Sequence, residues 1–354
     1  MWWPASRPAP SWSARTSWVC RCSTRTACAH CCGAARDRAV LARRAPRLGL
    51  ALGSGSARGW AHIGVLRALQ EAGVRPDFVC GASIGALVGA AYAAGELERF
   101  AEWVHGLGMR QVWGFMDFNL SGGMLKGERL IAFWRRNFAD FDIEASPLPF
   151  AAVATDLHSG AEVWLREGSI ADAVRASIAL PGLFTPVARA DGRLLVDGGI
   201  VNPVPTSLAR AMGADIVIGV DLNSDILQRH LQPLALAAAA NAADQAPSEP
   251  SEPEARSGGD WMGRLKFWGA GGAAQPQVAP LPPRPSVLDV VMTSVTIMQM
   301  RITRSRMAGD PPEVVIAPNL AHLGLLDFHR ADEAIEEGRR AAEAALPQLQ
   351  RFAV

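Results

Sequence analysis

The chain of 354 residues is poor in cysteine, almost without net charge, and free of long apolar runs. Five of its six cysteines lie in the first 32 residues. The rest of the chain contains one cysteine, Cys80, so it cannot be a disulfide-stabilised scaffold. We therefore expect the protein in the cytoplasm. A formal net charge of +1 gives no electrostatic basis for a nucleic-acid partner. No apolar stretch reaches the roughly 18 residues of a transmembrane helix, so none is predicted.

The first 45 residues lack the periodicity of a helix or a strand, although they contain several tryptophans. They also lack the apolar run of a secretory signal. We expect residues 1–45 to be a disordered leader, or a stretch translated from upstream of the natural start. The side chains of Cys28, His30, Cys31 and Cys32 could bind a metal, but they lack the paired spacing of a zinc module, so no metal is predicted.

A second unusual segment spans about 244–285 and is rich in Pro, Ser, Gly, Ala and Glu. Its composition predicts a disordered insertion without a core of its own. The stretch 261–268 inside it is aromatic and basic, which suits either docking on the body of the protein or peripheral contact with a membrane. Docking is the simpler interpretation, and membrane contact is the alternative.

The body of the chain begins with the order strand, turn, helix, repeated within about fifty residues. Strands are predicted at 47–52 and 77–81, and helices at 57–72 and 84–94. This order is typical of an α/β fold with a parallel sheet covered by helices. Further strands are predicted at 150–155, 162–165, 194–196, 215–220 and 313–317. Further helices are predicted at 126–137, 169–179, 206–212, 287–306 and about 330–345.

A G-x-S-x-G sequence lies where the second strand passes into the second helix. A serine on such a tight turn needs neighbours without bulky side chains, and Gly81 and Gly85 supply them. The helix begins at Ser83, so its positive end favours negative charge on the serine and on an oxyanion beside it. We interpret Ser83 as a nucleophile; the competing interpretation is a plain glycine-rich turn.

A second glycine-rich turn, Gly53-Ser54-Gly55-Ser56-Ala57-Arg58-Gly59, follows the first strand and opens the first helix. Its backbone N–H groups converge on a point that can hold a phosphate or an oxyanion. A dinucleotide fingerprint would need glycine in place of Arg58 and an acidic residue at the end of the next strand, where Asp77 stands at the start. Arg58 either braces the loop, faces a phosphate head group, or forms a surface ion pair.

A third element is Asp197-Gly198-Gly199, which follows an apolar strand. A carboxylate there can approach another loop closely, although an Asp-Gly turn alone would explain the pair. A conventional triad would add a histidine after the acid, which leaves His230, His322 and His329, with His322 the best placed. His62 is interpreted as a packing or hydrogen-bonding residue.

These three elements, in this order and spacing, resemble the patatin-like phospholipases, in the bacterial branch related to the catalytic domain of neuropathy target esterase. The segments 154–160, 176–184, 302–306 and 309–312 are also similar to segments of that family. The resemblance runs from about Arg47 to Ala345 and leaves out the leader and the insertion. It makes residues 46–345 one patatin-like hydrolase domain, interrupted at about 244–285, with 346–354 as a C-terminal tail.

The resemblance implies a three-layer α/β/α sandwich with a mostly parallel central sheet. It implies a Ser–Asp dyad without histidine, in which Ser83 is the nucleophile and Asp197 the base. The implied substrate is a lipid or lysophospholipid ester, and no metal or cofactor is implied. The oxyanion donors would come from the backbone of the glycine loop, that is, from Gly53, Gly55, Ser56, Ala57 and Arg58. The elbow glycines would be Gly81 and Gly85, and those of the acid loop Gly198 and Gly199.

One departure from the family concerns Ser54 and Ser56, which stand where glycines are usual. Serine keeps its N–H group, so an oxyanion hole can still form, but it tolerates fewer backbone angles. Two other functions remain open from the sequence: a non-catalytic lipid- or protein-binding regulator on the same fold, and a nucleotide-binding enzyme that uses the glycine loop.

Overall fold

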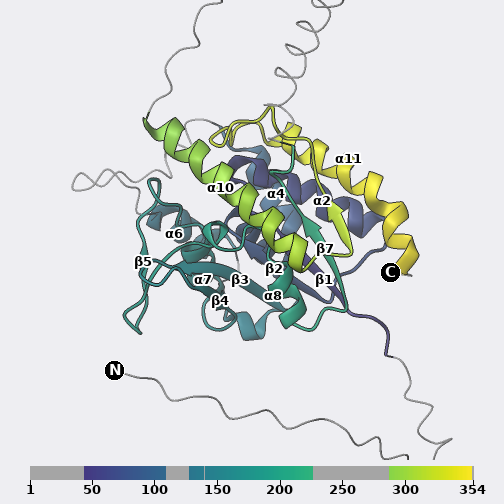
Figure 1. Ribbon diagram of the computed structural model, residues 1–354, viewed down its shortest axis with the longest axis horizontal. Helices are drawn as coiled ribbons and strands as arrows, with labels where there is room; N and C mark the ends of the chain where they lie inside the picture. The colour runs from purple at the N-terminus through teal and green to yellow at the C-terminus, as the bar shows by residue number, and fades with distance from the viewer. Residues whose placement is uncertain (1–43, 109–126, 139, 226–286, 353–354) are drawn as a thin grey trace, which may run out of the picture. The chain divides into compact units, whose positions relative to one another are not determined.

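Eight strands form one mixed sheet in the part of the chain that the computed structural model describes, namely residues 44–108, 127–138, 140–225 and 287–352 (Figure 1). The predicted leader (except residues 44 and 45) and insertion, with the stretch 261–268, lie outside these residues, as does His230. Residues Pro46–Val354 form one compact unit. The strands are β1 (Leu48–Leu52), β2 (Phe78–Ala82), β3 (Phe150–Asp156), β4 (Glu162–Leu165), β5 (Val187–Ala188), β6 (Leu194–Asp197), β7 (Ile216–Val220) and β8 (Val314–Ile316).

The strand order is β5-β6-β3-β2-β1-β7-β8, with β4 also paired to β3. The run from β3 to β8 is parallel, whereas β4 and β6 are antiparallel to β3, and β5 is antiparallel to β6. Every residue of β1, β2 and β7 is buried, as expected for parallel strands with helices on both faces. The carboxyl ends of β1 and β2 are neighbours, so the turns that follow them lie side by side.

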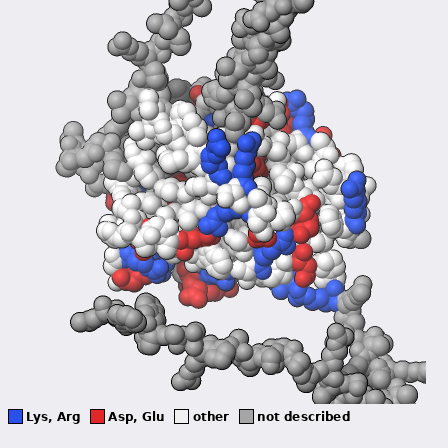
Figure 2. Space-filling view, viewed as in Figure 1, with Lys and Arg blue, Asp and Glu red and all other residues white. Residues whose placement is uncertain are grey.

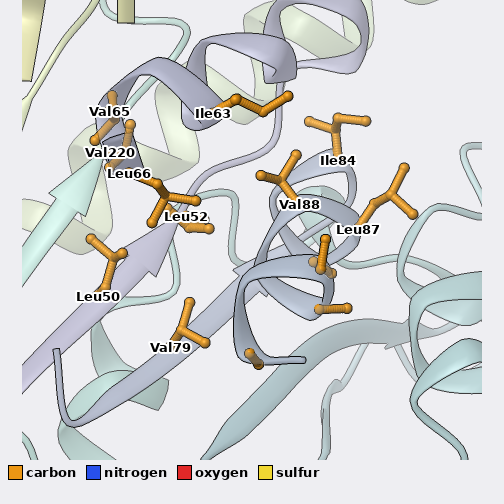
Figure 3. Packing of buried hydrophobic residues seen from close by; sticks show 14 of the residues in the cluster. Leu50, Leu52, Ile63, Val65, Leu66, Val79, Ile84, Leu87, Val88 and Val220 are labelled. Carbon is orange, nitrogen blue, oxygen red and sulfur yellow. The ribbon is translucent and has the colours of Figure 1, made fainter. Parts of the chain in front are cut away.

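Helices cover both faces of the sheet, which gives the three-layer α/β/α arrangement. On one face, Leu50, Leu52 and Val79 pack against α2 and α3 (Figure 3). On the other face, Ala51 and Cys80 pack with α8. The helices are α2 (Ala61–Glu71), α3 (Ile84–Ala93), α4 (Leu97–His105), α6 (Glu128–Asn137), α7 (Ile170–Ser177), α8 (Thr206–Ala211), α10 (Val287–Gly309) and α11 (Ala331–Leu349), with short 3-10 turns η2 (Ser56–Trp60), η3 (Ile143–Ala145), η4 (Gly198–Ile200) and η6 (Gln350–Phe352).

Most predicted elements are present, and the differences have local causes. The helix predicted from residue 57 begins as η2, because the turn tightens before α2 starts at Ala61. Helix α11 continues past the predicted end at Ala345 to Leu349, with Pro347 inside it. The sequence analysis missed α4 and the two-residue strand β5. Within the described residues, no helix is both long and apolar enough to cross a membrane.

Candidate active site

Ser83 lies on a strained turn between β2 and α3. Its backbone adopts φ 57° and ψ −125°, and the only other non-glycine residue with positive φ in the described part of the chain is Ser56. A side chain at Gly85 would place its Cβ 2.3 Å from the Leu52 carbonyl oxygen, and one at Gly81 would place it 2.4 Å from the Gly85 carbonyl oxygen. Both contacts are with backbone, so the turn requires glycine at both positions. This is the geometry of a nucleophile elbow.

Asp197 ends β6 and lies against Ser83, although 114 residues separate them along the chain. The Ser83 hydroxyl donates a hydrogen bond of 2.5 Å to Asp197 Oδ2, and the Gly199 N–H donates one of 2.6 Å to Oδ1. A Cβ at Gly198 would lie 2.1 Å from the Val153 carbonyl oxygen. The glycines after Asp197 therefore allow the carboxylate loop to approach β3 and the elbow closely.

The environment of Asp197 suits a base that works near neutral pH. The side chain is fully buried, and burial raises the pKa of Asp197 to about 7, against the opposing effect of the hydrogen bonds from Ser83 and Gly199. A carboxylate with an ordinary pKa would be a weak base toward a serine hydroxyl. Raising the pKa of Asp197 strengthens it as a base and still leaves much of it ionised at neutral pH.

Three of the five N–H groups expected to form the oxyanion hole donate to backbone carbonyl groups instead. The Gly53 N–H donates to Val220, the Ala57 N–H to Leu325, and the Arg58 N–H to Gly55. Ser54, which was not among the expected donors, is likewise engaged, with the Pro203 carbonyl group. These bonds close the turn, and local sequence cannot reveal them because most of the acceptors lie far away in the chain.

The N–H groups of Gly55 and Ser56 remain as candidate donors. Among the described residues neither has a hydrogen-bond partner, and both residues line the same cavity as Ser83. Ser56 holds φ 53°, a left-handed conformation that usually favours glycine and that strains serine. The replacement of glycine by serine at this position is therefore tolerated, but in a strained backbone held by its surroundings.

Residues from distant parts of the chain hold the glycine loop in place. The buried Arg58 donates to Asn223 Oδ1 at 2.9 Å and to the Leu323 carbonyl oxygen at 3.2 Å. The Asn223 amide in turn donates to the Ser54 carbonyl oxygen at 3.0 Å. Of the three roles that the sequence left open for Arg58, the structure thus favours bracing the loop.

His62 supports the same loop from α2. Its Nε2 lies 2.8 Å from the Gly53 carbonyl oxygen, so this nitrogen carries the proton and donates it. Burial lowers the pKa of His62 to about 4, and the ring is neutral at neutral pH. This agrees with the expected packing or hydrogen-bonding residue.

Of the histidines considered for a triad, the structure describes His322 and His329, and neither lies at Ser83. His322 is exposed at the surface, with Nε2 3.7 Å from Glu333 Oε2, and His329 is also exposed. Neither lines the cavity at Ser83. In the described ranges there is also no group of three or more His, Cys, Asp or Glu side chains placed to hold a metal ion.

The cavity beside Ser83 has a group of polar residues at the serine and a mostly apolar lining elsewhere, where Thr296 and Gln299 of α10 are the polar exceptions. Ser54, Gly55, Ser56 and Ser83 form the polar end. The apolar walls come from η2, α3, α4, α6, α10 and three loops and include Trp60, Leu87, Trp103, Leu183, Phe184 and Phe328. Such a cavity can hold an apolar chain whose polar head lies at the serine.

Sequence reasoning missed three polar residues near the serine. Ser177 accepts the Ser83 N–H at 2.9 Å and donates to the Val153 carbonyl oxygen at 2.6 Å. Gln299 of α10 accepts a hydrogen bond from the Ser54 hydroxyl at 3.2 Å, and Asn223 binds the loop as described. Ser177 lies in the segment 176–184 that resembles the family, but Asn223 and Gln299 have no local signal.

Comparisons with known proteins show the family of the chain. The family model described as patatin-like phospholipase matches residues 50–210. An uncharacterized NTE family protein of Mycobacterium tuberculosis is 34% identical over 330 residues, which cover 85% of this chain and 91% of that protein. Patatin-like phospholipase domain-containing protein 6 of Homo sapiens is 39% identical over 184 residues, which cover 50% of this chain but 13% of that protein.

The solved structure of VipD from Legionella pneumophila is a weaker match, with 13% identity and a TM-score of 0.40 over 86% of this chain and 67% of that chain. It has no bearing on function. The family matches support lipid hydrolase activity in general terms. The chain belongs to the patatin-like phospholipase family, in the branch of the NTE family proteins.

Proposed function

We propose that this protein is a serine hydrolase that cleaves acyl ester bonds of phospholipids or lysophospholipids through a Ser83–Asp197 dyad. The observation that carries the proposal is the 2.5 Å hydrogen bond from the Ser83 hydroxyl to the buried Asp197 carboxylate, at the polar end of an apolar cavity. A nucleophile within hydrogen-bonding distance of its base is the arrangement that covalent catalysis requires.

The proposed reaction has two steps. Asp197 accepts the Ser83 proton as Oγ attacks the ester carbonyl carbon, and the same proton passes to the departing alcohol when the C–O bond breaks. Water then attacks the acyl-serine while Asp197 accepts its proton. The bond from the acyl carbon to Ser83 Oγ breaks, Asp197 returns the proton to Oγ, and the fatty acid is released. The Gly55 and Ser56 N–H groups stabilise the oxyanion in both steps, and each such donor typically contributes about 10²–10³ in rate.

The substrate class follows from the cavity. Its apolar walls fit an acyl chain, and Ser83 in the lining can reach the ester of that chain. The name of the human relative, a patatin-like phospholipase domain-containing protein, supports a phospholipid ester. We place the enzyme in the cytoplasm, in peripheral contact with a membrane where its substrate resides.

The proposal is tested by hydrolysis of p-nitrophenyl butyrate and lysophosphatidylcholine. We expect Ser83→Ala to be inactive and Asp197→Asn to lose about 10²–10⁴ in kcat/KM, because the base is gone. His322→Ala is the matched control, since His322 lies at the surface, and it should retain wild-type activity.

Two outcomes would overturn the proposal. If the folded His322→Ala variant is as inactive as Asp197→Asn, a triad replaces the dyad. If the wild-type protein hydrolyses neither ester, the protein is not an esterase, and a lipid- or protein-binding regulator takes its place.

A further inference from the structure

Helix α10 exposes an unusual amount of apolar surface. In the described part of the chain seven large apolar side chains stand clearly exposed, and four of them belong to this one helix. They are Val290, Val291, Ile297 and Met298, of which Val290 is 50% exposed and Met298 55%. Their spacing of about seven residues, two helical turns, puts them on one side of α10. Exposed apolar side chains gathered in this way mark a site of interaction.

The opposite side of α10 faces the candidate active site. Met292, Val295 and Thr296 line the cavity that contains Ser83. One turn farther, Gln299 accepts the hydrogen bond from Ser54 in the glycine loop. A single helix thus separates the cavity from the exposed apolar side chains.

The charged residues of α10 lie toward its two ends, with Asp289 near the beginning and the arginines near the end. Between residues 290 and 309 the sequence has three arginines and no acidic residue. Arg301 and Arg304 are exposed and continue the outer side of the helix beyond Met298, whereas Arg306 pairs with Glu162 at 3.0 Å. Figure 2, seen from the side on which α10 crosses the molecule in Figure 1, shows uncharged surface at the upper left and arginine side chains toward the centre, with Asp and Glu side chains below and to the right of them.

We propose that this outer face of α10, formed by Val290, Val291, Ile297, Met298, Arg301 and Arg304, docks the protein on a bilayer that contains anionic phospholipids. An apolar stretch followed by arginines matches the interface of such a bilayer, where acyl chains lie beneath a layer of phosphate. Arginine pairs well with phosphate, and between Val290 and Gly309 no acidic residue of α10 would repel it. The choice of lipid over a protein partner rests on the proposed function, because the other side of α10 lines the cavity that would receive the acyl chain.

Vesicle flotation tests this surface without depending on activity. The full chain carrying Ser83→Ala, which leaves vesicle lipids intact, is mixed with vesicles of phosphatidylcholine alone or of equal parts phosphatidylcholine and phosphatidylglycerol. We expect binding to the anionic vesicles, a loss of at least about tenfold when Ile297→Glu and Met298→Glu are added, and about fivefold for each of Arg301→Gln and Arg304→Gln. Val315→Glu is the control, since Val315 is 41% exposed but lies on β8.

Several results would overturn the proposal. It fails if the protein floats with neither kind of vesicle, or if the Ile297→Glu/Met298→Glu protein, shown to be folded by its thermal unfolding, floats as well as its parent. It also fails if Val315→Glu weakens binding equally. A dimer in sedimentation velocity that the double substitution abolishes, without vesicle binding, would assign this face to a second copy of the chain. If the protein floats with anionic vesicles but the wild type hydrolyses no ester, the docking surface is supported and the proposed hydrolase activity alone is contradicted.

Discussion

The two turns that meet at the candidate active site both contain a serine at positive φ, but they are held in different ways. The residues that permit the elbow at Ser83 are its own neighbours, because Gly81 and Gly85 leave room for the backbone of β1 and of the elbow itself; Ser177 adds one distant hydrogen bond, from the Ser83 N–H. The glycine loop at Ser56 is held by residues from far along the chain, including Asn223, Gln299 and Leu325. One turn is specified locally, and the other is specified by the assembled fold.

The largest effect should come from filling the local turn. Gly85→Ala puts a Cβ 2.3 Å from the Leu52 carbonyl oxygen, which is backbone and cannot move away, so we expect ester hydrolysis to fall by more than about 10³. Gly89→Ala in the same helix is the control. Its Cβ would meet only side chains at 3.4 Å or more, and alanine favours a helix by up to about 1 kcal/mol.

Activity and unfolding free energy of both variants check this prediction. A fully active Gly85→Ala protein would show that the elbow is not sterically restricted. Destabilisation by Gly89→Ala equal to that by Gly85→Ala would show that the effect belongs to α3 as a whole.

The pH dependence should separate the dyad from His62, the histidine that supports the loop. Only ionised Asp197 can act as base, and its pKa is about 7, so kcat/KM should fall by about 10² from pH 8 to pH 5 and level off above pH 7. His62, with a pKa of about 4, cannot produce this inflection. A profile that is flat down to pH 5 in the ester assay would contradict the raised pKa of Asp197.

The same pKa has a consequence for stability. A carboxyl group whose pKa is higher in the folded state than in the unfolded state stabilises the fold most at pH values below the unfolded pKa, near 4. That stabilisation is lost as the pH rises through about 7. Between pH 4 and pH 7.5 the wild-type protein should therefore lose up to about 4 kcal/mol relative to Asp197→Asn in unfolding free energy. If the unfolding free energies of the two proteins change equally with pH, the raised pKa of Asp197 is contradicted.

A smaller effect is expected where the loop depends on distant residues. Arg58→Ala removes the guanidinium that donates to Asn223 and Leu323 and leaves both acceptors buried, which typically costs about 2 kcal/mol. If the substitution destabilises the catalytically competent conformation of the loop by this amount, kcat should drop about thirtyfold. Arg67→Ala is the control, because within the described ranges Arg67 forms an ion pair at the surface, with Glu98. Equal kcat values for the two variants would show that Arg58 does not hold the loop.

The smallest effect should come from the contact between the loop and α10. Ser54→Ala and Gln299→Ala each remove one neutral hydrogen bond, worth about 1 kcal/mol, so we expect about a fivefold drop in kcat for each. The double variant should be no worse than either single variant, because both substitutions break the same bond. Losses that multiply in the double variant would mean that the two residues act independently.

The difference between the two turns also explains what the sequence could predict. The elbow and Ser83 were predicted from glycines and a strand-to-helix change that are visible within a few positions. Asp197 was predicted as the base through the resemblance to the family, because an Asp-Gly turn alone would explain its local sequence. The resemblance to the family also predicted the three-layer fold, which the family match supports. The donors of the glycine loop were predicted too broadly, because the carbonyl groups of Val220, Pro203 and Leu325 reach the loop only after folding. Gln299, 245 residues from Ser54, was out of reach for the same reason.

The rate at which a fluorophosphonate labels Ser83 is the most direct test of the proposed dyad. It reports the nucleophile and its base without requiring the natural substrate. We predict that the wild-type protein and His322→Ala are labelled at Ser83 at the same rate, and that Asp197→Asn is labelled at least about 100-fold more slowly. Labelling of a residue other than Ser83, or an Asp197→Asn protein labelled as fast as the wild type, would contradict the dyad.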